Sequence, residues 1–212
     1  MQKNNISTSV IRRLPRYYRF LGGLLRQDIQ KISSRELSEM MRLTASQIRQ
    51  DLNCFGGFGQ QGYGYNVAEL RREIGHILGL DVSEKVILIG AGNLGRALTM
   101  HIDFEKYGYE LIGIFDSDIA MQDIEISGIR IKHTNQLDSF CRENKPTMAV
   151  LCIPRSGAKE TVEVLMSCGV NAFWNFSHYD ILFDFPDAKV ESVHLTDSLM
   201  TLSYAAKQRE EE

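Results

Sequence analysis

A glycine-rich loop between two apolar stretches constrains the fold of this chain more than any other feature. Residues 86–89 (VILI) form a short apolar run that predicts a buried strand. A G-x-G-x-x-G motif that opens a helix follows at once, formed by Gly90, Ala91, Gly92, Asn93, Leu94 and Gly95. A second predicted strand, residues 111–115, ends at Asp116, which lies 21 residues after Gly95. Strand, glycine loop, helix, strand and terminal acid in this order are typical of a Rossmann-type dinucleotide site.

Each position of this motif has a physical role. We expect Gly90 to allow the tight turn, Gly92 to let a pyrophosphate approach the backbone, and Gly95 to let helix and strand pack closely. The helix N-terminus adds free N–H groups and partial positive charge. Asp116 would accept hydrogen bonds from the adenosine ribose and repel a 2′-phosphate, so the motif favours NAD(H) over NADP(H).

Strand-like and helix-like stretches alternate after this unit. "GIRI", "MAVLCIP" and "NAFWNF" read as strands, and "TNQLDSFCREN" and "SGAKETVEVLMSCG" read as helices between them. This alternation predicts an α/β domain with a parallel, doubly wound sheet over residues 81–195. Pro154 lies at the carboxyl end of a predicted strand, where such sheets bind their ligands, and is a further cofactor-binding candidate.

Charge divides the chain into two parts. Residues 1–80 carry twelve Lys/Arg against six Asp/Glu, and residues 81–212 carry twelve against twenty-one. Halves of opposite sign suggest two domains, of which the first meets an anionic partner. A solvated basic helix face would give a similar count.

Two short helices joined by a tight turn are predicted in the basic part. "SSRELSEMMRL" begins with the capping box Ser33-x-x-Glu36 and places Leu37, Met40 and Met41 on one face. "TASQIRQDLNCFGG" begins with a second capping box, Thr44-x-x-Gln47, and stops at a glycine. This is the outline of a helix-turn-helix.

The second of these helices has two different faces. Ile48, Leu52 and Phe55 are spaced to pack inward. The opposite face carries side chains that can hydrogen-bond to base edges or phosphates, namely Ser46, Gln47, Arg49, Gln50 and Asn53. A recognition helix and an ordinary solvated helix both fit this face.

Five glycines between positions 56 and 64 exclude a continued helix. Gln60 and Gln61 fit a tight hairpin tip, and Tyr63, Tyr65 and Val67 alternate as in a strand. A hairpin here completes a winged helix-turn-helix domain over residues 1–80, and Gln60, Gln61 and Tyr63 become DNA-contact candidates. The alternative is a glycine-rich hinge.

The two ends of the chain are expected to be helical. Residues 7–26 carry apolar residues at helical spacing with Arg13 and Arg16 between them, and Pro15 implies either a kink or a helix that starts there. Both arginines are DNA-contact candidates. Residues 196–212 form a helix that is apolar nearly all round, which predicts burial against a partner subunit, with the helix exchanged between protomers of a homodimer.

Nothing in the sequence indicates a catalytic or metal centre. The five histidines form no motif, and the four cysteines lack metal-ligand spacing and suggest a reducing compartment. A signal peptide and a membrane span are not predicted, so we expect a cytoplasmic protein. The predicted nucleotide fold uses nearly all of the chain after residue 81, which leaves no substrate domain and argues against an enzyme.

The chain resembles the Rex family of redox-sensing transcriptional repressors over nearly its whole length. The resemblance is carried by "RRLPRYYRFL", "ISSRELSE", "TASQIRQDLNCFGGFGQQGYGYNV", "LIGAGNLGRAL", "VLCIPRSGAKE", "WNFS" and "VHLTDSLMTLSY". It implies a homodimer that binds double-stranded operator DNA when NAD⁺ predominates and is released by NADH. It also implies that Arg13 is similar to a family arginine whose contacts change between the two states.

The chain departs from the family pattern at several positions. The family usually has a tyrosine where His101 stands, a ring that responds to the cofactor, so His101 is a cofactor-binding candidate. The family's "NFAP" is "NFSH" here, and the segment after Asp116 is more acidic. Two alternatives remain open: a regulator that binds coenzyme A or another nucleotide, because residues 150–177 are also similar to CoA-binding domains of acyl-CoA ligases, and a small NAD-dependent oxidoreductase.

Overall fold

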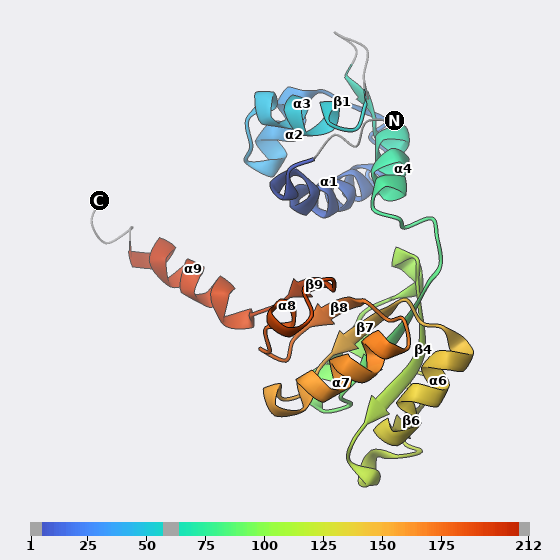
Figure 1. The fold of residues 1–212 in the computed structure, drawn as a ribbon. Coiled ribbons are helices and arrows are strands. Elements are labelled where there is room, and N and C mark those ends of the chain that lie inside the picture. Colours follow the sequence, from blue (N-terminus) through green and yellow to red (C-terminus); the bar gives the residue numbers. More distant parts are fainter. Residues whose placement is uncertain (1–5, 57–63, 208–212) are drawn as a thin grey trace. The chain divides into compact units, whose positions relative to one another are not determined.

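The computed structural model describes residues 6–56 and 64–207 and divides the chain into two compact units, Met1–Asp81 and Val82–Glu212 (Figure 1). The first unit contains four helices and a two-stranded sheet within its described residues. Their bounds are α1 (Thr8–Arg26), β1 (Lys31–Ile32), α2 (Ser34–Met41), α3 (Ala45–Asn53), β2 (Tyr65–Asn66) and α4 (Val67–Ile77).

Helix α1 supplies one side of the core of the first unit. Its buried side chains recur at helical spacing, at Val10, Leu14, Tyr17, Leu21 and Leu24. Ser7 caps the helix, so α1 begins well before Pro15, and of the two alternatives for Pro15 the helix that starts there is wrong. A proline inside a helix removes one backbone hydrogen bond, and the apolar face of α1 offsets this cost by packing against α2, α3 and α4.

Helices α2 and α3 form the predicted helix-turn-helix, with Arg42 in the left-handed conformation between them (φ 51°). The Ser33 capping box is complete. The Thr44 box is only half formed, because the Thr44 hydroxyl accepts from the N–H of Gln47 while the Gln47 side chain bonds elsewhere. Met40, expected on the inner face, is 43% exposed, since the buried stripe of this short helix runs through Leu37 and Met41.

Of the two residues predicted to continue the strand after the hairpin tip, one lies where predicted. Tyr65 lies in the strand β2, which pairs with β1 in antiparallel fashion, with Ile32 opposite Tyr65. Val67, expected at the end of a strand, is the first residue of α4, because the Asn66 side chain caps that helix by accepting from the N–H of Glu69. The predicted hairpin tip, with Gln60, Gln61 and Tyr63, lies outside the described residues.

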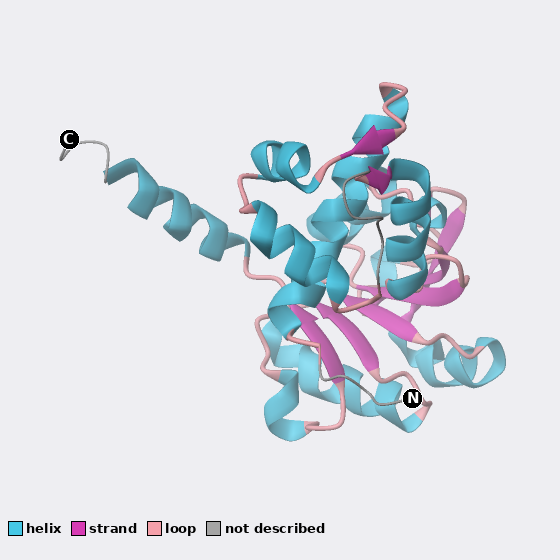
Figure 2. Ribbon diagram, turned by 90° about the horizontal axis from the view of Figure 1, so that it is seen from above, coloured by secondary structure: helices cyan, strands magenta, loops and turns pink. Residues whose placement is uncertain are grey.

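The second unit is built on a seven-stranded sheet (Figure 2). Its strand order is β5-β6-β4-β3-β7-β8-β9, and all neighbours run parallel except β5 and β6. The strands are β3 (Glu84–Ile89), β4 (Tyr109–Asp116), β5 (Glu125–Ile126), β6 (Ile129–His133), β7 (Met148–Leu151), β8 (Ala172–Asn175) and β9 (Lys189–Ser192). The order around β3 is that of a Rossmann sheet, which confirms the predicted doubly wound α/β fold of this unit.

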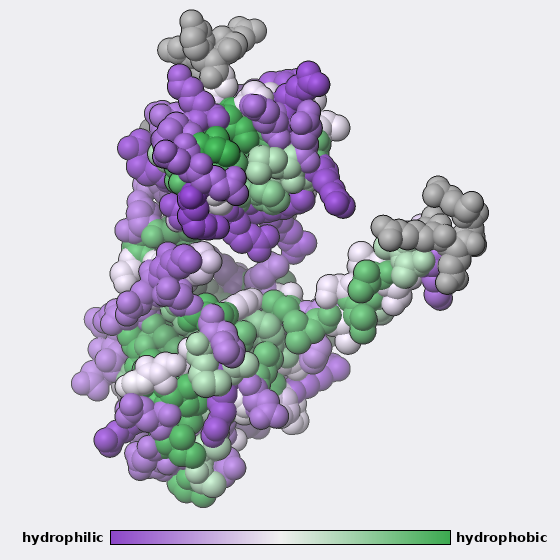
Figure 3. Space-filling model, turned by 180° about the vertical axis from the view of Figure 1, so that it is seen from behind, coloured by the Kyte–Doolittle hydropathy of each residue, from purple (hydrophilic) through white to green (hydrophobic). Residues whose placement is uncertain are grey.

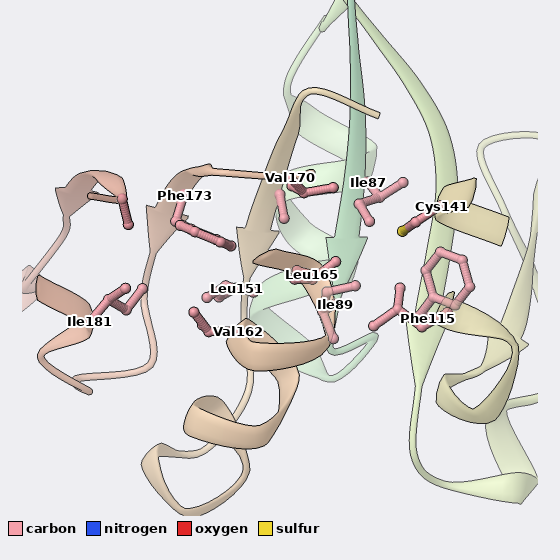
Figure 4. Packing of buried hydrophobic residues seen from close by; sticks show 13 residues of the cluster. Ile87, Ile89, Phe115, Cys141, Leu151, Val162, Leu165, Val170, Phe173 and Ile181 are labelled. Carbon is pink, nitrogen blue, oxygen red and sulfur yellow. The ribbon is translucent and has the colours of Figure 1, made fainter. Parts of the chain in front are cut away.

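Helices cover both faces of this sheet. One face packs against α6 (Leu137–Asn144) and α7 (Arg155–Ser167), where Ile87 and Ile89 of β3 meet Cys141 and Leu165 (Figure 4). The other face packs against α5 (Asn93–His101), through side chains that include Val86, Leu88 and Leu98. Strand residues of β3 therefore alternate between two separate cores, which explains the uninterrupted apolar run in the sequence.

The chain ends in a short helix, α8 (Ile181–Asp184), the strand β9 and the helix α9 (Leu195–Lys207). All residues of α9 are exposed, and hydrophobic side chains run along it (Figure 3). Leu199, Met200 and Leu202 are each more than 60% exposed, and Phe183 of α8 is 85% exposed. Among the described residues, no helix has the length and apolar character needed to cross a membrane.

Candidate functional site

The glycine loop after β3 has the backbone geometry that a dinucleotide site needs. Gly90 has φ +99°, and a Cβ at this position would lie 2.4 Å from the carbonyl oxygen of Cys152 at the end of β7. A Cβ at Gly95 would lie 1.9 Å from the carbonyl oxygen of Gly90. Both positions therefore require glycine, because the loop, the first turn of α5 and the end of β7 touch backbone to backbone.

Gly92 differs from the other two glycines of the motif. It is exposed, and a Cβ at this position would meet nothing within 4 Å. It is also the N-cap of α5, and no side chain caps that end of the helix. The N–H groups of the first turn are thus available to an anion, and the space in front of Gly92 is open.

Asp116 lies beside this loop at the end of β4. Its Oδ2 accepts a hydrogen bond of 2.7 Å from the N–H of Ala91, and its Oδ1 accepts one of 2.9 Å from the N–H of Asp118. The sequence predicted Asp116 as a ribose acceptor; the structure adds that the same carboxylate holds the glycine loop. Carboxylate oxygens have further lone pairs, so both contacts leave room for a ribose hydroxyl.

The remaining cofactor candidates lie at the carboxyl ends of strands and at a helix end. Pro154 is exposed and is the N-cap of α7, which also begins without a side-chain cap. His101 is exposed at the C-terminal end of α5, one helix length away from the glycine loop. Arg96 points back to the loop, where its Nε donates to the carbonyl of Ala91 at 3.1 Å.

The second candidate site is the outer face of α3 in the first unit. Ser46, Arg49, Gln50 and Asn53 are exposed, as predicted for a recognition face. Ile48 and Leu52 are buried on the opposite side. The Arg49 guanidinium donates to the hydroxyl of Ser34 at 3.2 Å, which links the outer face of α3 to the first turn of α2.

Helix α3 is held in place by a buried carboxylate, Asp51, which the sequence analysis did not identify. Asp51 is fully buried and accepts hydrogen bonds from Arg13 at 2.6 and 2.7 Å, from Tyr17 at 2.9 Å and from Gln47 at 2.8 Å. Burial raises the pKa of Asp51, and the bonds from Arg13, Gln47 and Tyr17 outweigh it, so that this pKa is below its ordinary value. The signal was present in the sequence, because Asp51 follows Ile48 by three residues and so lies on the buried face.

Arg13 and Gln47, both predicted to contact DNA, are thus partners of Asp51 in this structure. Arg16, predicted likewise, donates through Nη2 to the carbonyl of Met41 at 2.5 Å, near the end of α2. These contacts link α1 to the helix-turn-helix, and roles at DNA for the three residues stay predictions. Among the described residues, no group of three or more His, Cys, Asp or Glu side chains could hold a metal ion.

Comparisons with known proteins match the two units to two different family models. Residues 5–53 match the family model described as "Putative DNA-binding protein N-terminus", and residues 81–179 match "CoA binding domain". A redox-sensing transcriptional repressor Rex from Clostridium kluyveri is 49% identical over 95% of this chain and 96% of its own length. The one from Clostridioides difficile is 50% identical over 96% of this chain and 97% of its own length.

Two solved structures of a protein named RSP are also similar. Its complex with β-NAD⁺ and operator DNA is 48% identical, with a TM-score of 0.89 over 98% of this chain and 95% of that one. Its complex with β-NADH is 46% identical, with a TM-score of 0.90 over 98% and 97%. Sequence and fold agree along both units, and the chain belongs to the Rex family of redox-sensing transcriptional repressors.

Proposed function

We propose that this chain is a transcriptional repressor that senses the NADH/NAD⁺ ratio. It binds operator DNA with NAD⁺ or without cofactor and is released by NADH. The observation that carries the proposal is the presence of two binding units in one chain, a helix-turn-helix with a polar exposed face and a Rossmann sheet with an open glycine loop. The likeness to the two RSP complexes, one with NAD⁺ and operator DNA and one with NADH, supports it.

In this proposal residues 81–195 bind the dinucleotide. The N–H groups of Asn93 and Leu94, at the uncapped start of α5, receive the pyrophosphate, which passes in front of Gly92. Asp116 binds the adenosine ribose. Pro154 and His101 contribute to the more distant part of the cofactor site, beyond the pyrophosphate.

Residues 1–80 bind DNA through α3 and the segment after it. Ser46, Arg49 and Gln50 present hydrogen-bonding groups to the duplex, and Gln60, Gln61 and Tyr63 follow the backbone from the predicted wing. Arg13 and Gln47 contact DNA from the edge of this surface, because each donates a hydrogen bond to Asp51 on the buried side of α3. Arg16 joins them as a phosphate contact from α1.

The central test is a titration of the protein into a fluorescent duplex that the purified chain has selected from randomised DNA. Fluorescence anisotropy is measured without cofactor, with NAD⁺ and with NADH. We expect tight binding in the first two conditions and release in the third. Identical curves with NAD⁺ and NADH would refute redox sensing while leaving DNA binding intact.

We further propose that the chain is a homodimer in which the C-terminal helix, α9, packs against the partner subunit and is exchanged between protomers. The exposed Leu199, Met200 and Leu202 support this, because a helix that exposes apolar side chains on several sides gains free energy by burial. Replacing Leu199 and Leu202 by Glu should give a monomer in light scattering. Ser203→Glu on the same helix is the matched control and should leave the dimer intact; a wild-type monomer would refute the proposal.

The protein is not an enzyme in this proposal, and it acts in the cytoplasm. A regulator that binds coenzyme A is the alternative that a specific observation favours, since residues 81–179 match a family model described as CoA binding domain. Titration of the protein with NADH, NAD⁺ and CoA, followed by nicotinamide and Trp174 fluorescence, separates the two. Saturable binding of CoA and not of NADH would replace the first proposal by the second.

A further inference from the structure

His133 ends the strand β6 directly beside the end of β4, where Asp116 lies. The two residues are register partners in the parallel pair β4–β6. Both ring nitrogens of His133 have backbone partners within hydrogen-bond distance: Nε2 lies 3.1 Å from the carbonyl oxygen of Ser117, and Nδ1 lies 3.2 Å from the amide nitrogen of Asn135. The ring therefore bridges the segment after β4 and the segment after β6.

These two partners determine which ring nitrogen donates and which accepts. A backbone N–H can only donate, so Nδ1 must be the unprotonated nitrogen that accepts from Asn135. A carbonyl oxygen can only accept, so Nε2 must carry the proton. In this arrangement Nδ1 therefore accepts from Asn135 and Nε2 donates to Ser117.

The contact with Ser117 acts on Asp116 through a single peptide group. The carbonyl of Ser117 and the N–H of Asp118 belong to the same planar peptide unit and point in opposite directions. His133 binds the carbonyl side, and the N–H side donates to Oδ1 of Asp116 at 2.9 Å. The ring thereby orients the peptide that holds one carboxylate oxygen, while the N–H of Ala91 holds the other.

We infer that His133 is a positioning residue for dinucleotide selectivity, because it holds the Ser117–Asp118 peptide and so keeps the Asp116 carboxylate directed at the adenosine ribose. This inference rests on the proposed function of Asp116 as the ribose ligand. A carboxylate in a fixed direction binds the 2′-hydroxyl of NADH and repels the 2′-phosphate of NADPH. A carboxylate that is free to rotate binds the 2′-hydroxyl less tightly and repels the 2′-phosphate less strongly.

The test compares His133→Asn with His133→Ala. Asparagine retains the cap on the Asn135 N–H, because its short side chain readily accepts from the N–H two residues on, but it is too short to hold the Ser117 carbonyl as well. Alanine loses both contacts. Dissociation constants for NADH and NADPH are measured by nicotinamide fluorescence, with His76→Asn in the first unit as a control for histidine replacement in general.

We expect the preference for NADH over NADPH to fall about tenfold in both His133 variants and to stay at the wild-type ratio in His76→Asn. A wild-type ratio in His133→Asn with a reduced one in His133→Ala would show that the cap on Asn135 matters instead, and would overturn the inference. An equal loss of affinity for both nucleotides would also overturn it, since general loosening of the fold does not discriminate between them.

The position of the ring proton provides a measurement that needs no cofactor. In a long-range ¹H–¹⁵N spectrum of the wild-type chain, the neutral form of His133 should carry its proton on Nε2. A ring protonated at Nδ1 would contradict the geometry. A wild-type chain that bound neither nucleotide but showed the expected tautomer would refute the proposed function, and with it the role of His133 in selectivity, while the hydrogen-bond arrangement stood.

Discussion

The two candidate binding elements of this molecule are held in place in different ways. In the first unit, side chains hold helix α3, since Asp51 of α3 is buried and accepts hydrogen bonds from Arg13, Tyr17 and Gln47. In the second unit, backbone holds the glycine loop, since Gly90 and Gly95 allow contacts that no Cβ would permit. The position of α3 depends on a buried charge, and the position of the glycine loop depends on close backbone contacts. Different substitutions and conditions should therefore disrupt the two.

The largest effect is expected where space is tightest. Gly95→Ala gains about 1 kcal/mol of helix propensity but places a Cβ 1.9 Å from the carbonyl oxygen of Gly90. That overlap must push α5 away from β3, and we expect a net loss of about 4 kcal/mol in the stability of the second unit. Urea unfolding followed by the fluorescence of Trp174, the single tryptophan, measures it. Gly92→Ala is the matched control, and an equal loss there would contradict the backbone explanation.

Loss of the Asp51 charge should destabilise the first unit almost as much. Asp51→Asn preserves the size of the side chain but removes the charge that faces Arg13, so we expect a loss of about 3 kcal/mol in the stability of that unit. Urea unfolding monitored by circular dichroism detects this loss, and Trp174 fluorescence should show the second unit unchanged. A neutral outcome would mean that the ion pair does not hold α3.

Low pH should affect the two units differently. The pKa of Asp51 is lowered in the folded state, so its stabilisation is present above the ordinary aspartate pKa of about 4 and is lost as the pH falls through the lower folded value. The stability difference between wild type and Asp51→Asn should therefore shrink as the pH falls from 5 to 2. No such convergence is expected for Gly95→Ala, because steric overlap does not titrate.

A smaller effect is expected at the exposed outer face of α3. Arg49→Ala removes a cation from the outer side of α3 and should weaken operator binding by about 1–3 kcal/mol. NADH affinity should stay at the wild-type value, because Arg49 belongs to the other unit. Anisotropy with the selected duplex and fluorescence titration with NADH check the two statements. Equal loss of both activities would indicate misfolding rather than a lost DNA contact.

The smallest expected effect is at the loop itself. Gly92→Ala adds a methyl group where the structure is open, so the stability of the second unit should stay within about 0.5 kcal/mol of wild type. If the pyrophosphate passes in front of this residue, the affinity for NADH should fall about tenfold, which corresponds to about 1.4 kcal/mol. Unchanged NADH affinity would move the proposed pyrophosphate path away from Gly92.

Most of the fold could be predicted from local patterns. The strand before the glycine loop, the helix-turn-helix and the alternation after residue 116 each have a periodicity or a capping signal that depends on near neighbours. Helix α4 was not predicted, because its cap, Asn66, lies next to a glycine-rich stretch and the alternation of Tyr65 and Val67 favours a strand there. Met40 was placed on the wrong side because a helix of eight residues has too few turns to define its inner face.

Order and spacing along the chain are enough to predict the two-unit arrangement, the family and the residue types at each candidate site. Which polar groups become hydrogen-bond partners depends on the three-dimensional fold. Asp51 and Arg13 are 38 residues apart and His133 and Ser117 are 16 apart, and no local pattern says which distant groups will meet. Folding brings these groups together because each buried or constrained polar group needs a hydrogen-bond partner. The partner is here a residue of a different helix, strand or loop.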